Sequence, residues 1–248
     1  MTAAAADNEC IHVAVGTCNG EIAVLNFSSG GVLYNLPHQD KEITCLKFLT
    51  GCKSTLNEIF LVGEFWLVAG TWGGKLVLYT EPNEDNNYQI TAKCRIGHRG
   101  DVLVVESDIN NIVSGGIDGM ITVWNQFSGV RKFAFPLPDP LQEDQPNSKL
   151  TSVQSHIRKK ISDVMFDPIF SNLVYVMQDS GNVHVVDISN GSIVSDYIAF
   201  MKVNSSWALS SKKGRVFVVG EMGMAALFDI TLPSGVLEQI QKGKQHTT

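Results

Sequence analysis

One stretch decides the fold of this 248-residue chain: Ile112–Asn125, which reads IVSGGIDGMITVWN. Two runs with alternating apolar residues flank a short turn that ends at Gly119. Alternation is typical of β-strands, and a glycine adopts the positive φ of a tight turn without a Cβ clash. The stretch is therefore predicted to form a β-hairpin.

The same pattern recurs four more times in a common register. In each copy a large apolar side chain follows the turn glycine by five residues. The predicted hairpins are 13–26, 67–80, 112–125, 174–187 and 216–229, with turn glycines Gly20, Gly74, Gly119, Gly181 and Gly223. Successive turn glycines lie 54, 45, 62 and 42 residues apart, at or above the ~40–45 residues of a four-stranded propeller blade.

Apolar runs between the hairpins supply the other two strands that a blade needs. The expected inner strands are 43–48, 102–106, 161–166 and 205–209, and the expected outer strands are 32–36, 88–94, 130–135, 192–198 and 236–240. The fold class is thus all-β, a β-propeller of about five four-stranded blades over residues 11–241. Residues 1–10, rich in alanine, are expected to be a flexible segment, and 242–248 a C-terminal tail.

Five blades is a low count for a fold that has ~4–8. An incomplete ring exposes strand edges and an apolar blade face. We therefore expect a partial ring, or one that another chain completes.

Two stretches, 50–65 and 136–154, exceed what one blade requires. The second carries Pro136, Pro138 and Pro140, and prolines at that density do not join a sheet interior. It is predicted to be an extended surface loop, either a partner-binding element or a passive insertion.

The third repeat carries a fuller signature: Gly97-His98, then Ser114-Gly115-Gly116, Asp118 in the turn, and Trp124-Asn125. It resembles the WD40 repeat family, with Asn125 in place of the usual terminal Asp. The resemblance implies that His98, Ser114, Asp118 and Trp124 form the side-chain hydrogen-bond network that locks one blade. His38 and His156 precede their inner strands at nearly the same offset as His98 and suggest degenerate copies.

A longer stretch supports a closer resemblance. The segments AGTWGGKLVLYTEPNEDNNYQ, IGHRGDVLVV and GGIDGMITVWNQFSG are similar to the large axonemal WD-repeat proteins of cilia that also carry EF-hands. The resemblance implies a structural component of the ciliary axoneme, which belongs to the microtubule-associated cytoskeleton. No EF-hand loop occurs in the chain, so calcium binding is not carried over.

Catalytic signatures are missing from the sequence. It contains no phosphate-binding loop, no GxGxxG after a strand, no HExxH and no GxSxG, and its six histidines fall on different repeats without metal-ligand spacing. We predict no catalytic, cofactor-binding or metal-binding residues, and no enzyme.

Charge and hydropathy limit the partners. The formal net charge of −6 disfavours phosphate backbones and anionic lipid, and no window of about 18 apolar residues could insert into a membrane. The five cysteines form no CxxC pair and are expected to be reduced, mostly buried thiols of a cytoplasmic protein.

These features predict a non-enzymatic scaffold that binds other proteins, and the resemblance implies that these partners are axonemal or other large-complex components. A soluble cytoplasmic WD40 adaptor in a ubiquitin-ligase or trafficking assembly remains an alternative, and a propeller enzyme or channel-binding receptor is a further one. Trp72 lies in a predicted tight turn, where it either packs against a neighbouring blade or stands exposed as a binding anchor.

Overall fold

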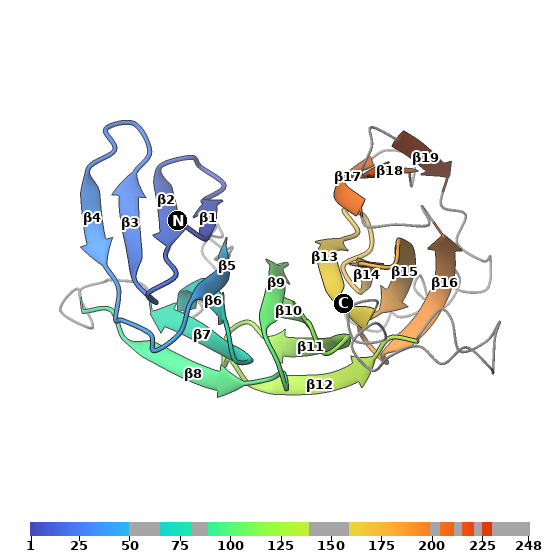
Figure 1. Cartoon of the computed structure of the whole chain (residues 1–248), viewed down its shortest axis with the longest axis horizontal. Coiled ribbons are helices and arrows are strands. Elements are labelled where there is room, and N and C mark those ends of the chain that lie inside the picture. Colours follow the sequence, from blue (N-terminus) through green and yellow to red (C-terminus); the bar gives the residue numbers. More distant parts are fainter. Residues whose placement is uncertain are drawn as a thin grey trace, which may run out of the picture. The chain divides into compact units, whose positions relative to one another are not determined.

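A computed structural model of the chain describes residues 1–49, 65–80, 89–138, 159–198, 204–210, 215–220 and 225–229. These residues form nineteen strands in five antiparallel sheets, whose strands are labelled in Figure 1. Four sheets have four strands, and the fifth has three within the described residues. The all-β fold class is confirmed.

In each sheet the strands follow one another in sequence order, so every neighbouring pair is a hairpin. We call the sheets blades 1 to 5. Blade 1 holds β1 (Ala3–Ala6), β2 (His12–Gly16), β3 (Ile22–Asn26) and β4 (Val32–Asn35). Blade 2 holds β5 (Ile43–Phe48), β6 (Phe65–Thr71), β7 (Lys75–Thr80) and β8 (Ala92–Ile96). Blade 3 holds β9 (Val102–Ser107), β10 (Asn111–Gly116), β11 (Met120–Asn125) and β12 (Arg131–Pro136). Blade 4 holds β13 (Ile161–Phe166), β14 (Leu173–Gln178), β15 (Asn182–Asp187) and β16 (Ser192–Ile198). Blade 5 holds β17 (Asn204–Ser210), β18 (Arg215–Gly220) and β19 (Ala225–Asp229).

The chain divides into two compact units, Met1–Leu137 with blades 1 to 3 and Pro138–Thr248 with blades 4 and 5. Within the first unit, the sheets bury aliphatic and aromatic side chains between neighbouring blades. One cluster joins blades 1 and 2 around Ile22, Val24, Leu67 and Tyr79. Another joins blades 2 and 3 around Leu76, Leu78, Ile112 and Trp124.

The turn glycines adopt the conformation that the sequence predicts. The φ angles of Gly20, Gly74, Gly119 and Gly181 are 85°, 82°, 73° and 90°. Gly223 lies outside the described residues. At Gly20 an added Cβ would lie 1.9 Å from the carbonyl oxygen of Gln39, so the turn packs tightly against the loop that leads to the next blade.

The expectation for residues 1–10 is wrong. Ala3–Ala6 form β1, which pairs antiparallel with β2 and completes blade 1. Just before it, the hydroxyl of Thr2 donates a 2.7 Å hydrogen bond to the carbonyl of Ile43 in blade 2. Alanine is a weak strand former, but pairing to an existing hairpin overrides that preference.

Two other boundaries need correction. The fourth strand of blade 2 begins at Ala92, later than the predicted 88–94. Pro136 is the last residue of β12, a strand at the sheet edge where a missing N–H is tolerated, so the loop starts after it. Pro138 is exposed and accepts a hydrogen bond from Gln178 through its carbonyl. Pro140, His156, the strand at 236–240, the tail 242–248 and most of the stretches 50–65 and 136–154 lie outside the described residues.

The cysteines are less buried than expected. Cys10, Cys18 and Cys94 are exposed, and all four described cysteines are free thiols. Burial raises the pKa of the Cys45 thiol to about 12, so this group stays protonated and unreactive at neutral pH.

Candidate functional site

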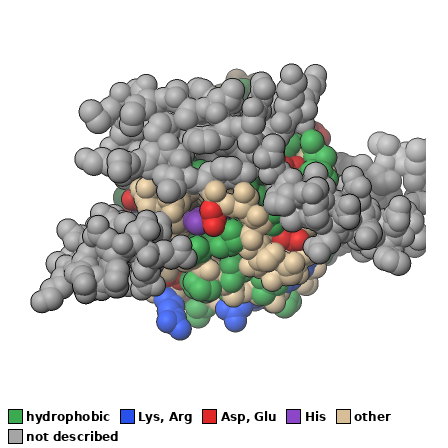
Figure 2. All heavy atoms as spheres, turned by 90° about the vertical axis from the view of Figure 1, so that its right-hand side faces the viewer, with side chains coloured by type: hydrophobic (Ala, Val, Ile, Leu, Met, Phe, Trp, Pro, Cys, Tyr) green, Lys and Arg blue, Asp and Glu red, His purple; other side chains and the backbone are tan. Residues whose placement is uncertain are grey.

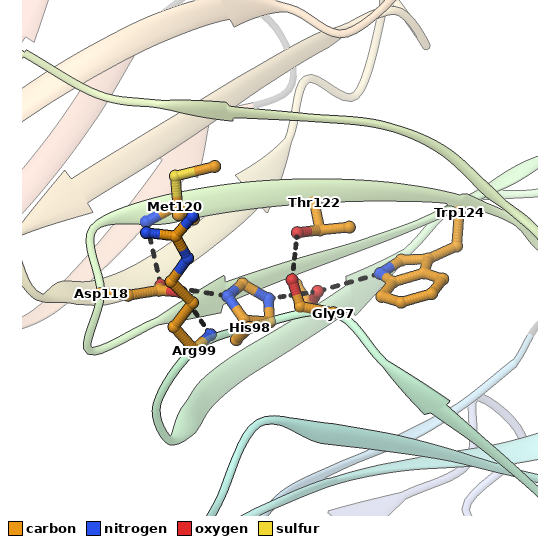
Figure 3. Close-up of polar contacts among 8 residues, drawn as sticks. Gly97, His98, Arg99, Asp118, Met120, Thr122 and Trp124 are labelled. Carbon is orange, nitrogen blue, oxygen red and sulfur yellow. Dashed lines mark hydrogen bonds and ion pairs between the residues drawn. The ribbon is translucent and has the colours of Figure 1, made fainter.

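A chain of hydrogen bonds crosses blade 3 from its turn to its core (Figure 3). His98 precedes β9, Ser114 lies on β10, Asp118 is in the β10–β11 turn, and Trp124 lies on β11. Nδ1 of His98 lies 3.1 Å from Oδ1 of Asp118, and Nε2 lies 2.8 Å from Oγ of Ser114. The indole N–H of Trp124 donates to the same Oγ over 2.9 Å. The structure therefore brings together all four residues that the resemblance implies.

Donor and acceptor chemistry fixes the direction of this network. The indole N–H can only donate, so Oγ of Ser114 accepts it and turns its own proton toward Nε2 of His98. That arrangement leaves the imidazole proton on Nδ1, where it is donated to Asp118. Every polar group in the network is paired, which is what a buried polar cluster needs in order to stabilise a sheet.

Ser114, His98 and Asp118 have the composition of a hydrolytic triad, but their placement does not permit that chemistry. The Ser114 side chain is 0% exposed, and its oxygen already accepts a hydrogen bond from the indole N–H of Trp124. A nucleophile must reach its substrate. This trio therefore holds two strands and a turn together.

The stability that the Asp118 carboxylate contributes to blade 3 depends on pH. Burial alone would raise the pKa of its carboxyl group, but the hydrogen bond with His98 and those from the backbone N–H groups of Arg99 and Met120 outweigh burial and lower that pKa below its usual 3.8. A lowered folded-state pKa contributes stability above 3.8 that is lost as the pH falls through the folded value.

We accordingly expect Asp118→Asn to be less stable than the wild type at about pH 6, with the difference shrinking as the pH falls below about 4. Urea denaturation of both proteins across this range measures it. A stability difference that is constant with pH would mean that the Asp118 carboxylate does not hold the turn.

Of the two predicted degenerate copies, the one at His38 lies within the described residues, and there the structure differs from the sequence prediction. In blade 2 the residue that stands where His98 stands in blade 3 is Gln39, because it precedes β5 and its carbonyl faces Gly20, the turn glycine of the preceding blade, as that of His98 faces Gly74. Gln39 is buried, whereas His38 is exposed. The prediction is therefore wrong by one residue. It selected His38 because His38 is a histidine like His98, although the equivalent position is that of the next residue, Gln39.

Blade 4 contains a polar network that sequence reasoning missed. His184 on β15 is buried, with Nδ1 against Asp196 on β16 and Nε2 3.0 Å from Oε1 of Gln178 on β14. Its position corresponds to Thr122 of blade 3, not to His98, so no motif indicates it. In the sequence, only the hairpin register could have indicated this network, because it places His184 opposite Val176 as it places Thr122 opposite Ser114.

Trp72 is the most exposed tryptophan whose side chain the structure describes, with 55% of its surface open. Its turn is held from two sides. The N–H of Trp72 donates to the carbonyl of Glu42 over 2.9 Å, and the N–H of Gly73 donates to Oδ1 of Asp101 over 3.0 Å. Of the two alternatives left open by the sequence, exposure is the observed one.

A second exposed apolar residue, Ile117, also forms a hydrogen bond with Asp101. Ile117, 38% exposed, donates its N–H to the carbonyl of Asp101 over 2.9 Å. Trp72 and Ile117 hold equivalent positions before the turn glycines of blades 2 and 3. Together with Asp101 between them they form a surface that we call the Trp72 surface.

Within the described residues, no group of three or more His, Cys, Asp or Glu side chains is arranged to hold a metal ion. The same part of the chain contains no helix that is long and apolar enough to cross a membrane.

Comparisons with known proteins show the fold alone. No family model matches the chain, and no curated protein matches it. Among solved structures 1550 chains match, so the fold is widespread and does not by itself select a function. A chain of the "Crystal Structure of Mitotic Checkpoint Complex" aligns with a TM-score of 0.66 and 17% identity, over 92% of this chain and 62% of that chain. This protein thus spans less than two thirds of that chain, and its fold is a WD40-type β-propeller.

Proposed function

We propose that this protein is a non-enzymatic scaffold that binds other proteins through the Trp72 surface. The observation that carries the proposal is the exposure of Trp72 on a turn that is fixed by two hydrogen bonds, which its N–H groups donate to neighbouring segments. Tryptophan is enriched among the residues that dominate protein–protein binding energy. A fixed turn supports that role, because less conformational freedom of its backbone is lost on binding.

The charges around this surface fit a protein partner. Charged side chains of both signs lie near it: Asp40 and Arg99 are exposed, and Glu42 and Asp101 are partly exposed. Nζ of Lys75 lies 3.4 Å from Oδ2 of Asp40. A mixed polar rim around an apolar centre is the usual composition of a protein-binding site. Figure 2 faces the right-hand side of Figure 1, where blades 4 and 5 are drawn; there, Lys and Arg side chains gather at the lower edge of the described residues, with acidic and hydrophobic side chains above them.

Trp72→Ala is expected to weaken incorporation of the protein into its native assembly by about 30-fold or more, equal to at least about 2 kcal/mol. The measurement is competition between tagged variant and tagged wild type for the assembly isolated from cells. Ile109→Ala is the matched control, because Ile109 is 52% exposed but lies in the β9–β10 turn, at the other end of the strands from the Trp72 turn. Equal incorporation of wild type and Trp72→Ala would rule out the Trp72 surface.

The location of that assembly is part of the proposal. The resemblance of the stretch from Ala69 to Gly129 to axonemal WD-repeat proteins supports a place in the ciliary axoneme, while the comparisons contribute only the fold. Fractionation of cilia tests it: the protein should remain with detergent-extracted axonemes. Recovery in the cytosol with ubiquitin-ligase or coat components would favour the adaptor alternative and overturn the axonemal location.

A further inference from the structure

One backbone hydrogen bond recurs beside the turn glycines of three blades. The residue two positions before the turn glycine donates its N–H to the carbonyl of the last residue before the first strand of the same blade, over 2.9 Å in each case. We call the two residues of such a bond a turn pair. The turn pairs are Trp72 with Glu42 in blade 2, Ile117 with Asp101 in blade 3, and Asp179 with Lys160 in blade 4.

The turn pair of blade 4 is complementary in charge, and those of blades 2 and 3 are not. Nζ of Lys160 lies 3.9 Å from Oδ1 of Asp179, so a cation and a carboxylate face each other in that pair. In blades 2 and 3 the charged member is an acid, and its partner is an indole or an aliphatic side chain. Within the residues that the structure describes, the carboxylates of Glu42 and Asp101 form no ion pair. These two negative charges therefore lack the counter-charge that blade 4 has.

Both acidic residues hold the turn that carries Trp72. Glu42 accepts the N–H of Trp72 through its backbone carbonyl, and Oδ1 of Asp101 accepts the N–H of Gly73 over 3.0 Å. Both acidic side chains are partly exposed, and Oδ2 of Asp101 accepts no hydrogen bond from the described residues. The indole of Trp72 is 55% exposed. An open indole and two accessible carboxylates from different segments thus lie at one turn.

The basic residues nearest in sequence contact other parts of the chain. The backbone carbonyl of Lys41 lies against the turn of blade 1, 2.8 Å from where a Cβ of Gly20 would stand. Nζ of Lys75 lies 3.4 Å from a carboxylate that belongs to neither turn pair. The guanidinium of Arg99 lies beside Met120 (Figure 3). A cation that pairs with the two carboxylates at the Trp72 turn is therefore one that a partner brings.

We propose that the Trp72 surface binds an arginine side chain of its partner protein, with the guanidinium stacked on the indole of Trp72 and paired with the carboxylates of Asp101 and Glu42. This inference rests on the proposed function and names the group that the surface recognises. Tryptophan is the aromatic side chain that attracts cations most strongly. A guanidinium is planar, stacks on aromatic rings and carries several N–H donors, so it can contact the ring and both carboxylates at once. An ammonium is compact and strongly hydrated, which favours arginine over lysine.

Titration of the full chain with an arginine derivative tests this recognition directly. The probe is Nα-acetylarginine amide, and its control is Nα-acetylcitrulline amide, which has nearly the same shape without the charge. NMR of the isotope-labelled protein follows the indole N–H of Trp72, which is assigned by its loss in Trp72→Ala. We expect the arginine probe to shift this resonance in a saturable way and the citrulline probe to leave it in place. Equal shifts from the two probes, including none from either, or a larger shift from Nα-acetyllysine amide would overturn the proposal.

Asp101→Asn separates the charge of Asp101 from its role in holding the turn, because an amide oxygen still accepts the N–H of Gly73. This variant should incorporate into the native assembly about fivefold less well than the wild type, with unchanged hydrogen exchange of the Gly73 amide. Asp108→Asn is the matched control and should incorporate like the wild type. Asp108 lies in the β9–β10 turn, at the other end of the strands, and its Oδ1 likewise accepts backbone N–H groups. No loss for Asp101→Asn, or a loss that comes with faster exchange at Gly73, would contradict recognition through this charge.

The pattern of incorporation separates this proposal from the proposed function. Poor incorporation of Trp72→Ala together with full incorporation of Asp101→Asn would leave the Trp72 surface as the binding site and overturn arginine recognition. Full incorporation of both variants would overturn both proposals. Both are supported if the two variants incorporate poorly and only the arginine probe shifts the indole N–H of Trp72.

Discussion

Trp124→Ala is expected to lower the free energy of unfolding by about 3–5 kcal/mol, as deletion of a buried aromatic side chain does. Trp124 is 1% exposed and packs with Leu78 and Ile112 between blades 2 and 3. Its ring also faces Gly97 so closely that a Cβ there would lie 2.3 Å from Cζ2. Removing the indole opens a cavity, and it also removes the N–H group that donates a hydrogen bond to Oγ of Ser114.

Chemical denaturation followed by circular dichroism measures this loss without relying on tryptophan fluorescence. Trp72→Ala is the matched control: the same side chain is deleted, but from the surface, and a loss below about 1 kcal/mol is expected. Equal losses for the two variants would show that Trp124 is not part of the core.

Gly74→Ala is expected to reduce stability by at least about 2 kcal/mol. Two effects add. The φ of 82° is unfavourable for any residue with a Cβ, and that Cβ would lie 2.3 Å from the carbonyl oxygen of His98. The carbonyl is not free to move, because the N–H groups of Gly97 and His98 both donate to the carbonyl of Gly74.

Gly73→Ala separates the two effects. Gly73 also has a positive φ, 105°, but nothing lies within 4 Å of its added Cβ. This variant should therefore be more stable than Gly74→Ala in the same denaturation experiment. If Gly73→Ala is the less stable of the two, close packing of the turn against the His98 loop is refuted.

The hairpins are the part of the fold that the sequence predicts best. Glycine, strand alternation and turn length act within 14 residues, so local chemistry decides them. The bounds of β5, β13 and β16 agree with the predicted strands at 43–48, 161–166 and 192–198. In these segments the apolar pattern, β-branched residues and turn residues all favour the same structure.

The errors arise where distant parts of the chain decide the outcome. Ala3–Ala6 form a strand because β2 offers an edge to pair with, which no local propensity indicates. Gln39 takes the place of His98 because the position of its carbonyl over Gly20 is set by the backbone. The exposure of Trp72 depends on Glu42 and Asp101, which hold its turn from two other segments.

The central claim is that successive hairpin repeats stack side by side as blades. Zero-length carbodiimide cross-linking followed by mass spectrometry tests it directly, because Nζ of Lys47 on β5 lies 2.7 Å from Oε2 of Glu106 on β9, in the next blade. We predict a Lys47–Glu106 cross-link in the native protein that disappears in Glu106→Gln. A native protein in which Lys47 cross-links only to carboxylates outside blade 3 would contradict the stacking of these blades.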